Sequence, residues 1–134
     1  MPKKNNGSFD TNMLLRLLLD DVPGQTAAVE KLLRPGRTYE VADVALIEMV
    51  FVLEKVYEMD RSLIKENVIG IIRNRSFICN SSLFERTMPL YVAEPSLSVV
   101  DCTLLTYAQL NSALPLYTFD KKLITVSDGD SVAP

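Results

Sequence analysis

Apolar residues recur at helical spacing along most of the chain, and this pattern predicts a series of helices. Residues 13–19 are apolar except for Arg16, so we expect a helix that is buried on most sides. Residues 44 to about 57, after an Asp43 N-cap, form the most apolar helix. Other helices are expected over residues 25–33, over residues 99–111 after a Ser98 cap, and as one turn over residues 121–124. Two further helices are expected: one starts after an Asp60 cap, and one starts at Asn80 and Ser81 and is kinked or ended by Pro89.

Short strand-like runs separate these helices. They cover residues 6–9, 38–41, 76–79 and 116–119, and residues 125–126 form a short fifth run. Strands that alternate with helices favour an α/β fold with a parallel sheet. We therefore expect a three-layer α/β/α fold with a central parallel sheet of four to five strands. All 134 residues are predicted to form a single domain, with residues 1–5 and the polar tail 127–134 as flexible ends.

Composition narrows the chemistry that this chain can carry out. It contains no histidine, which excludes Ser-His-Asp and Cys-His catalysis, histidine zinc sites and histidine general bases. Cys79 and Cys102 have no metal-ligand spacing and are expected to be reduced. The net charge of −3 argues against a protein that coats nucleic acid nonspecifically, because such proteins are normally basic. It does not exclude a nuclease, in which clustered acids are neutralised by bound cations. No signal peptide or long apolar run is evident, so a cytoplasmic protein is expected.

Four acidic residues stand at positions where a metal site is possible, and each also has a simpler explanation. Asp10 and Asp120 both follow strands, and either could be a helix N-cap. Asp101 lies three residues after Ser98, which is the spacing of a capping box. Glu48 lies within the most apolar helix, where a buried carboxylate needs a partner such as Arg16, a proton or a metal.

The predicted topology can bring these four acids to one edge of the sheet. Asp10 and Asp120 end strands, the helix of Asp101 starts at the same edge, and Glu48 lies only about 7 Å along its own helix. Two carboxylates about 4 Å apart repel by about 4 kcal/mol at an effective dielectric constant near 20. Magnesium or manganese would compensate for this repulsion, because hard cations take oxygen ligands.

The sequence around these acids resembles the PIN-domain ribonucleases, and within them the VapC-like toxins of toxin–antitoxin pairs. The similarity extends from about residue 8 to 124. It rests on the ordered set Asp10-Thr-Asn-Met-Leu-Leu-Arg, Glu48 in Leu-Ile-Glu-Met-Val-Phe-Val-Leu, Asp101 in Ser-Val-Val-Asp, and Thr-Phe-Asp120-Lys-Lys-Leu. Two features depart from the family pattern: the run of residues 4–8 before Asp10 is polar, and Pro89 interrupts the helix that precedes Asp101.

The resemblance implies a strand order of 3-2-1-4-5 and a metal-dependent endoribonuclease, the toxin of a type II toxin–antitoxin system. Asp10, Glu48, Asp101 and Asp120 would hold Mg²⁺ or Mn²⁺ and activate a water that cleaves RNA phosphodiester bonds. Asn12 and Thr118 would support this site. The implied partners are RNA, a small cognate antitoxin and a second copy in a homodimer. Basic residues near the site are weaker candidates for contacts to RNA, namely Arg16, Arg86, Lys121 and Lys122.

Two alternatives stay open. The chain could be a catalytically silent PIN-fold binding module that acts through protein partners, with the apolar stretches 13–19 and 63–72 as partner surfaces. It could also be a phosphatase with Asp10 as an aspartyl nucleophile. Asn12 disfavours the phosphatase, because such enzymes need a second aspartate at that position as a general acid.

Overall fold

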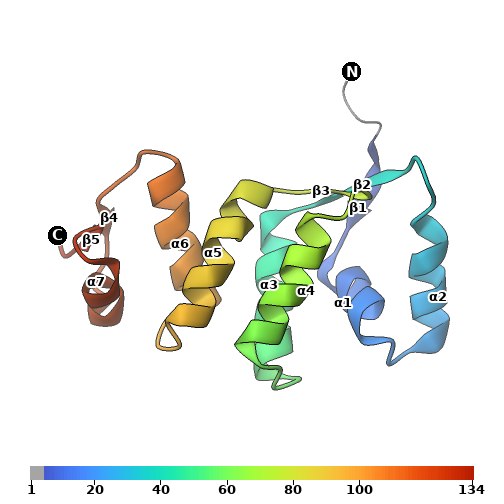
Figure 1. Cartoon of the computed structure of the whole chain (residues 1–134), viewed down its shortest axis with the longest axis horizontal. Helices are drawn as coiled ribbons and strands as arrows, with labels where there is room; N and C mark the ends of the chain where they lie inside the picture. The colour runs from blue at the N-terminus through green and yellow to red at the C-terminus, as the bar shows by residue number, and fades with distance from the viewer. Residues whose placement is uncertain (1–4) are drawn as a thin grey trace. The chain divides into compact units, whose positions relative to one another are not determined.

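The computed structural model describes residues 5–134, which form two compact units (Figure 1). The first unit ends at Asn80, and the second runs from Ser81 to Pro134. The first contains β1 (Asn5–Phe9), α1 (Thr11–Leu19), α2 (Pro23–Leu32), β2 (Thr38–Val41), α3 (Asp43–Lys55), α4 (Arg61–Ile72) and β3 (Phe77–Ile78). The second contains α5 (Ser81–Ala93), α6 (Val99–Leu110), β4 (Leu116–Tyr117), α7 (Lys121–Ser127) and β5 (Ser131–Val132).

Each unit has its own parallel sheet. In the first unit the strand order is β1-β2-β3, and in the second β4 pairs with β5. The prediction of a mixed α/β fold with parallel strands is therefore confirmed. The predicted central sheet of four to five strands is not confirmed, since the described strands form sheets of three and two. A single domain can contain two compact units, so the prediction of one domain stays a prediction.

An aromatic cluster holds the three strands of the first unit together. The Phe9 ring lies 5.1 Å from the Tyr39 ring and 5.2 Å from the Phe77 ring, measured between centroids. All three side chains are buried, and each comes from a different strand. The Tyr39 hydroxyl also donates a 2.7 Å hydrogen bond to the carbonyl of Leu32 at the end of α2. The cluster thus fixes both the sheet and one of its covering helices.

Strand β1 forms although its residues have low strand propensity, because a bulge replaces part of its regular pairing. Asn5 pairs with Thr38 and Ser8 with Glu40, so three steps along β1 match two along β2. Gly7 lies inside this bulge with φ +138°, a conformation that favours glycine. The Asn6 side-chain oxygen accepts a 3.0 Å hydrogen bond from the Thr38 amide. Local side-chain bonds therefore stabilise a strand that its composition does not favour.

The connection between α1 and α2 shows how proline can start a helix. Asp20 ends α1 in the left-handed conformation. Pro23, which precedes the helix expected over residues 25–33, is the first residue of α2, where a missing amide hydrogen costs nothing. The Thr26 hydroxyl then donates a 3.0 Å hydrogen bond to the Arg16 carbonyl and links the two helices.

Helix α3 is less buried than its composition suggested. Leu46, Met49 and Leu53 are fully buried, but Val44 and Phe51 are 69% and 55% exposed. The predicted Asp43 N-cap is also wrong: Ala42 is the cap residue, and Asp43 begins the helix and accepts a hydrogen bond from Asn80. Asp60 does occupy the N-cap position of α4, but its side chain makes no capping bond.

In the second unit, α5 continues through Pro89, which does not end the helix. Helix α6 packs against α5 and begins with the predicted capping box. The Ser98 hydroxyl accepts a 3.1 Å hydrogen bond from the Asp101 amide, and the Asp101 carboxylate accepts a 3.3 Å bond from the Ser98 amide. Between the two helices, the buried hydroxyls of Thr87 and Thr106 lie 2.6 Å apart.

The C-terminal residues differ most from the prediction. Thr125 and Val126, expected to be a fifth strand, lie in α7, which is longer than the single turn expected over residues 121–124. The fifth strand is β5, within residues 127–134 that we expected to be a polar tail. Ser131 is buried there, and the Thr118 amide donates a 3.0 Å hydrogen bond to the Val132 carbonyl. Of the N-terminal end predicted to be flexible, residues 1–4 lie outside the described residues.

No helix within residues 5–134 is both long enough and apolar enough to cross a lipid bilayer.

The capping box yields a test of the second unit. Replacing Ser98 with alanine removes the hydroxyl that accepts the Asp101 amide, so we expect the free energy of unfolding to fall by about 1 kcal/mol. Urea denaturation followed by circular dichroism measures this change. Ser96→Ala is the matched control, because Ser96 is exposed and lies outside α6. Equal unfolding midpoints for the two variants would contradict the assignment.

Candidate functional site

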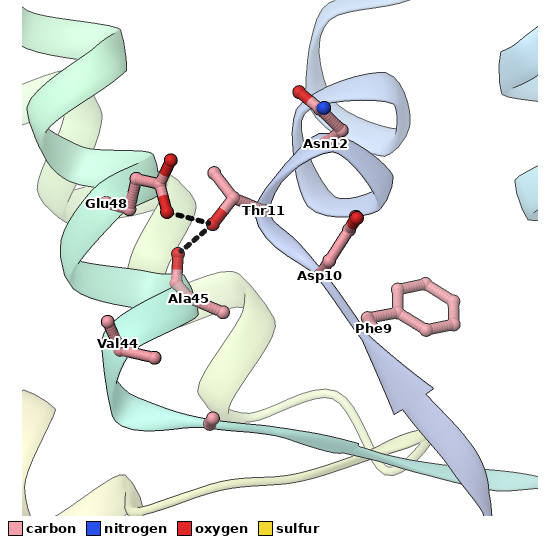
Figure 2. Close-up of a pocket in the computed structure, with 8 residues that line it drawn as sticks. Phe9, Asp10, Thr11, Asn12, Val44, Ala45 and Glu48 are labelled. Atoms are coloured by element: carbon pink, nitrogen blue, oxygen red, sulfur yellow. Dashed lines mark hydrogen bonds between the residues drawn. The ribbon is translucent and has the colours of Figure 1, made fainter.

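An open pocket of about 370 Å³ lies where β1 ends and α1 and α3 begin (Figure 2). Phe9 is the last residue of β1 and pairs with Val41, the last residue of β2. The chain leaves both strands at the same edge of the sheet, so α1 and α3 start side by side. The pocket is lined by Phe9, Asp10, Thr11, Asn12, Ala42, Val44, Ala45 and Glu48. Two of the four predicted acids, Asp10 and Glu48, therefore line one pocket.

Asp10 is the N-cap of α1, as its simpler interpretation predicted. Its Oδ1 atom accepts a 2.9 Å hydrogen bond from the Met13 amide. The side chain is exposed, and Oδ2 accepts no hydrogen bond from the part of the chain that the structure describes. Capping thus engages one carboxylate oxygen and leaves the second available to a ligand.

Glu48 is exposed, which corrects the prediction that it is buried inside an apolar helix. The reason is that α3 has an open face, on which Glu48 lies between the exposed residues Val44 and Phe51. Its Oε2 atom accepts a 3.3 Å hydrogen bond from the Thr11 hydroxyl. The suggested partner Arg16 instead forms a 2.6 Å ion pair with Asp21. Glu48 therefore needs neither burial nor a salt bridge to Arg16 to be stable at this position.

Thr11 is a pocket residue that the sequence analysis did not single out. Its hydroxyl lies 3.2 Å from the Ala45 carbonyl and 3.3 Å from Glu48, and Figure 2 shows it directed toward α3 from between Asp10 and Glu48. Since a hydroxyl has one proton, these two acceptors share it. The available signal was a hydroxyl at the first position of a mostly apolar helix, directly after the predicted acid Asp10.

Asn12 and Arg16 lie on the adjoining part of α1. Asn12 is exposed, lines the acid pocket, and makes no side-chain hydrogen bond within the described chain. The Arg16 side chain is only 14% exposed, and its ion pair with Asp21 neutralises much of its charge. The Tyr57 hydroxyl also donates a 3.3 Å hydrogen bond to Asp21, which further fixes this group.

The other two predicted acids lie in the second unit, and both cap helices. Asp101 is half-buried within the capping box of α6. Asp120 is exposed, and its Oδ1 atom accepts hydrogen bonds from the amides of Lys122 and Leu123 at 2.9 and 3.2 Å. Its own amide donates a 3.0 Å hydrogen bond to the Thr118 hydroxyl, so Thr118 organises the turn that carries Asp120.

The basic residues of the second unit are exposed. Lys121 and Lys122 begin α7 directly after Asp120. Arg86 lies on α5 at a groove of about 420 Å³, lined by Glu85, Arg86, Pro89, Leu90, Leu105, Thr106, Gln109, Val126 and Ser127. Their predicted contacts with RNA stay predictions.

The donor chemistry of the first pocket suits a hard divalent cation. Asp10 and Glu48 each present an exposed carboxylate, and Asn12 adds an amide oxygen on the same wall. Within either described unit, however, no group of three or more acidic or thiol side chains is close enough to hold a metal ion. The Asp10–Glu48 pair is therefore a partial ligand set, and two carboxylates alone leave most coordination positions of such a cation to water.

Comparison with protein-family models finds no match for the chain, and a search of curated proteins finds none either. The resemblance to PIN-domain ribonucleases thus stays a hypothesis that rests on the residues themselves.

Thr11 provides a test of the pocket's framework. Replacing it with valine keeps the shape but removes the hydroxyl that bonds Ala45 and Glu48, so we expect the free energy of unfolding to fall by about 1 kcal/mol. Thr125→Val is the matched control: its exposed hydroxyl bonds only to its own helix, and the expected change is within about 0.5 kcal/mol. Urea denaturation compares the two, and similar losses in both would contradict the structural role of Thr11.

Proposed function

We propose that this protein is a metal-dependent endoribonuclease similar to the PIN-domain toxins of type II toxin–antitoxin systems. The observation that carries the proposal is the shared pocket at the carboxyl end of β1, where Asp10 and Glu48 both have a carboxylate oxygen open to solvent. Ligands of parallel α/β sheets bind at this edge. Because the chain has no histidine, the proposed source of hydrolytic chemistry is a cation bound by carboxylates.

The residues of the pocket have separate roles in this proposal. Asp10 and Glu48 bind Mg²⁺ or Mn²⁺, and the Asn12 amide orients the ligands around them. The cation supplies Lewis-acid chemistry, which lowers the pKa of water and neutralises charge on phosphate oxygens. The Thr11 hydroxyl holds Glu48 in place. Lys121 and Lys122 contact RNA phosphates and leave sequence selection to other groups.

The proposal needs Asp101 and Asp120 to join the first two acids. The family order 3-2-1-4-5 in a three-layer fold would make β1 and β4 neighbours and bring Asp120 to Asp10. The strand order within each unit supports this part of the proposal, because the first unit has β3-β2-β1 and the second pairs β4 with β5. The proposed partners are RNA, a small antitoxin and a second copy of the chain.

A catalytically silent binding module is the competing proposal, and one face of α6 favours it. Val100, Leu104 and Tyr107 are each about half exposed and lie on one face of the helix, at spacings of four and three residues. The capping bonds of Asp101 and Asp120 also account for these acids without any metal. Metal binding at the acid pocket separates the two proposals.

Manganese titration is the first test. Isothermal titration of the full chain with MnCl₂ should detect binding, and Asp10→Asn or Glu48→Gln should weaken it by about tenfold or more, since even outer-shell changes cost that much. Glu30→Gln is the matched control, because Glu30 is exposed on α2 and lies outside the pocket. Unchanged manganese affinity in the Asp10 and Glu48 variants would overturn the metal site and favour the catalytically silent binding module.

RNA cleavage is the second test. With Mg²⁺ or Mn²⁺ the protein should cut RNA, and a chelator should abolish the activity. Asp10→Asn, Asp101→Asn and Asp120→Asn should each lower the rate by about a hundredfold, the typical cost of removing one electrostatic group from an active site. Asp128→Asn is the control, because Asp128 is an exposed left-handed helix cap that asparagine suits. Chelator-insensitive cleavage, or full activity of the Asp10 variant, would end the nuclease proposal.

A further inference from the structure

A second cavity adjoins the acid pocket and shares two of its residues. It measures about 220 Å³ and lies between α1 and α2, lined by Asp10, Asn12, Met13, Arg16, Gln25, Ala28 and Val29. Asp10 and Asn12 line both cavities, so these two residues lie where the cavities meet. The first cavity offers acids to a cation, whereas most of the exposed surface of the second is apolar. The two cavities therefore suit chemically different parts of one molecule.

The walls of this second cavity are held in place by bonds outside it. The Thr26 hydroxyl donates to the carbonyls of Arg16 and Val22, at 3.0 and 3.3 Å, which ties α2 to α1. Arg16 is fixed by Asp21, and Asp21 also accepts the Tyr57 hydroxyl. A ligand would thus meet a pre-formed site and would not have to order it.

The charges in the cavity disfavour a phosphate there. Arg16 is the one cation among the lining residues, and it is already paired with Asp21 at 2.6 Å. Asp10 adds a negative charge to the lining of the cavity, so an anion would be repelled. A neutral group fits these charges better.

The polar groups at the rim suit a planar heterocycle. Asn12 and Gln25 are exposed, and their side-chain amides make no hydrogen bonds within residues 5–134, so each side chain can offer a donor and an acceptor to a ligand. Amide side chains in this role pair with the edges of nucleobases. Met13, Ala28 and Val29 provide apolar contact for a ring, and the Arg16 guanidinium provides a planar group of the kind on which bases stack.

We infer that the cavity between α1 and α2 is a nucleobase subsite, which receives the base next to the phosphate held at the Asp10–Glu48 pocket. The inference rests on the proposed nuclease function for the position of that phosphate. Gln25 is then a specificity-determining residue, because its amide reads the edge of the base, and Ala28 keeps the entrance open.

The first experiment is a metal-free titration with adenosine, guanosine, cytidine and uridine, followed by methyl NMR of Met13 and Ala28. We expect saturable shifts of both methyl groups and a preference of about tenfold for one base, as a bidentate amide contact provides. Ala28→Phe should fill the entrance and weaken binding by about tenfold or more. Ala27→Phe is the matched control, since Ala27 is the neighbouring exposed alanine of α2 and does not line the cavity. Gln25→Leu should retain binding but reduce the base preference.

The second experiment maps the cleavage sites of these variants by sequencing RNA products. Wild-type protein and Ala27→Phe should share one base preference beside the cut, and Ala28→Phe should lose it. Cleavage with an unchanged preference in Ala28→Phe would overturn the subsite while the nuclease stands. Nucleoside binding at Met13 and Ala28 without any cleavage would overturn the nuclease and retain the subsite. If nucleosides cause no shift at either methyl group, the cavity is not a nucleobase subsite, and a side chain of a protein partner becomes the better occupant.

Discussion

The pairing of Phe9 with Val41 determines where the chemistry of the first unit can lie. These residues end two adjacent parallel strands, and the Phe9 ring is fixed between Tyr39 and Phe77. Asp10 follows Phe9 directly, and Ala42 follows Val41 as the cap residue of α3, so Asp10 and Glu48 line one pocket. Neither acid has to pay for burial, because both are exposed. The sheet therefore positions the starts of both helices, and the Met13 amide and the Thr11 hydroxyl then orient the two carboxylates.

Capping and metal binding are usually treated as alternatives for an aspartate, but in this chain they use different atoms. Asp10 and Asp120 each cap a helix through Oδ1, and the capping bond of Asp101 uses Oδ2. In each case one oxygen holds the side chain at a defined angle while the other remains outside the cap. A capped aspartate is then a pre-oriented donor, and the entropy of fixing its rotamer is already lost in the folded protein.

The features that could be predicted from sequence are those set by short-range rules. The Asp10 cap, the Ser98–Asp101 capping box and β2 all follow from residue types at fixed spacings. The exposure of Glu48 could not be predicted from such rules, because an apolar helix is buried only where another element packs against it, and Val44 and Phe51 are exposed. Thr125 and Val126 have β-branched side chains, yet the Asp120 cap places them in a helix. Strand β5 consists of Ser131 and Val132 in a polar stretch without an apolar run, and the pocket role of Thr11 depends on a residue 37 positions away.

The bulge at Gly7 changes the face of the sheet on which the side chains of β1 lie. Side chains alternate between the two faces of a strand, so one inserted residue reverses the parity of everything after it. Phe9 is the one buried residue among the five of β1, and its pairing with Val41 places its ring on the face of Tyr39 and Phe77. The change of face at the bulge therefore falls on the less buried residues that precede Ser8. An irregular, polar start of the strand is in this way compatible with a regular, buried end directly before the first acid of the site.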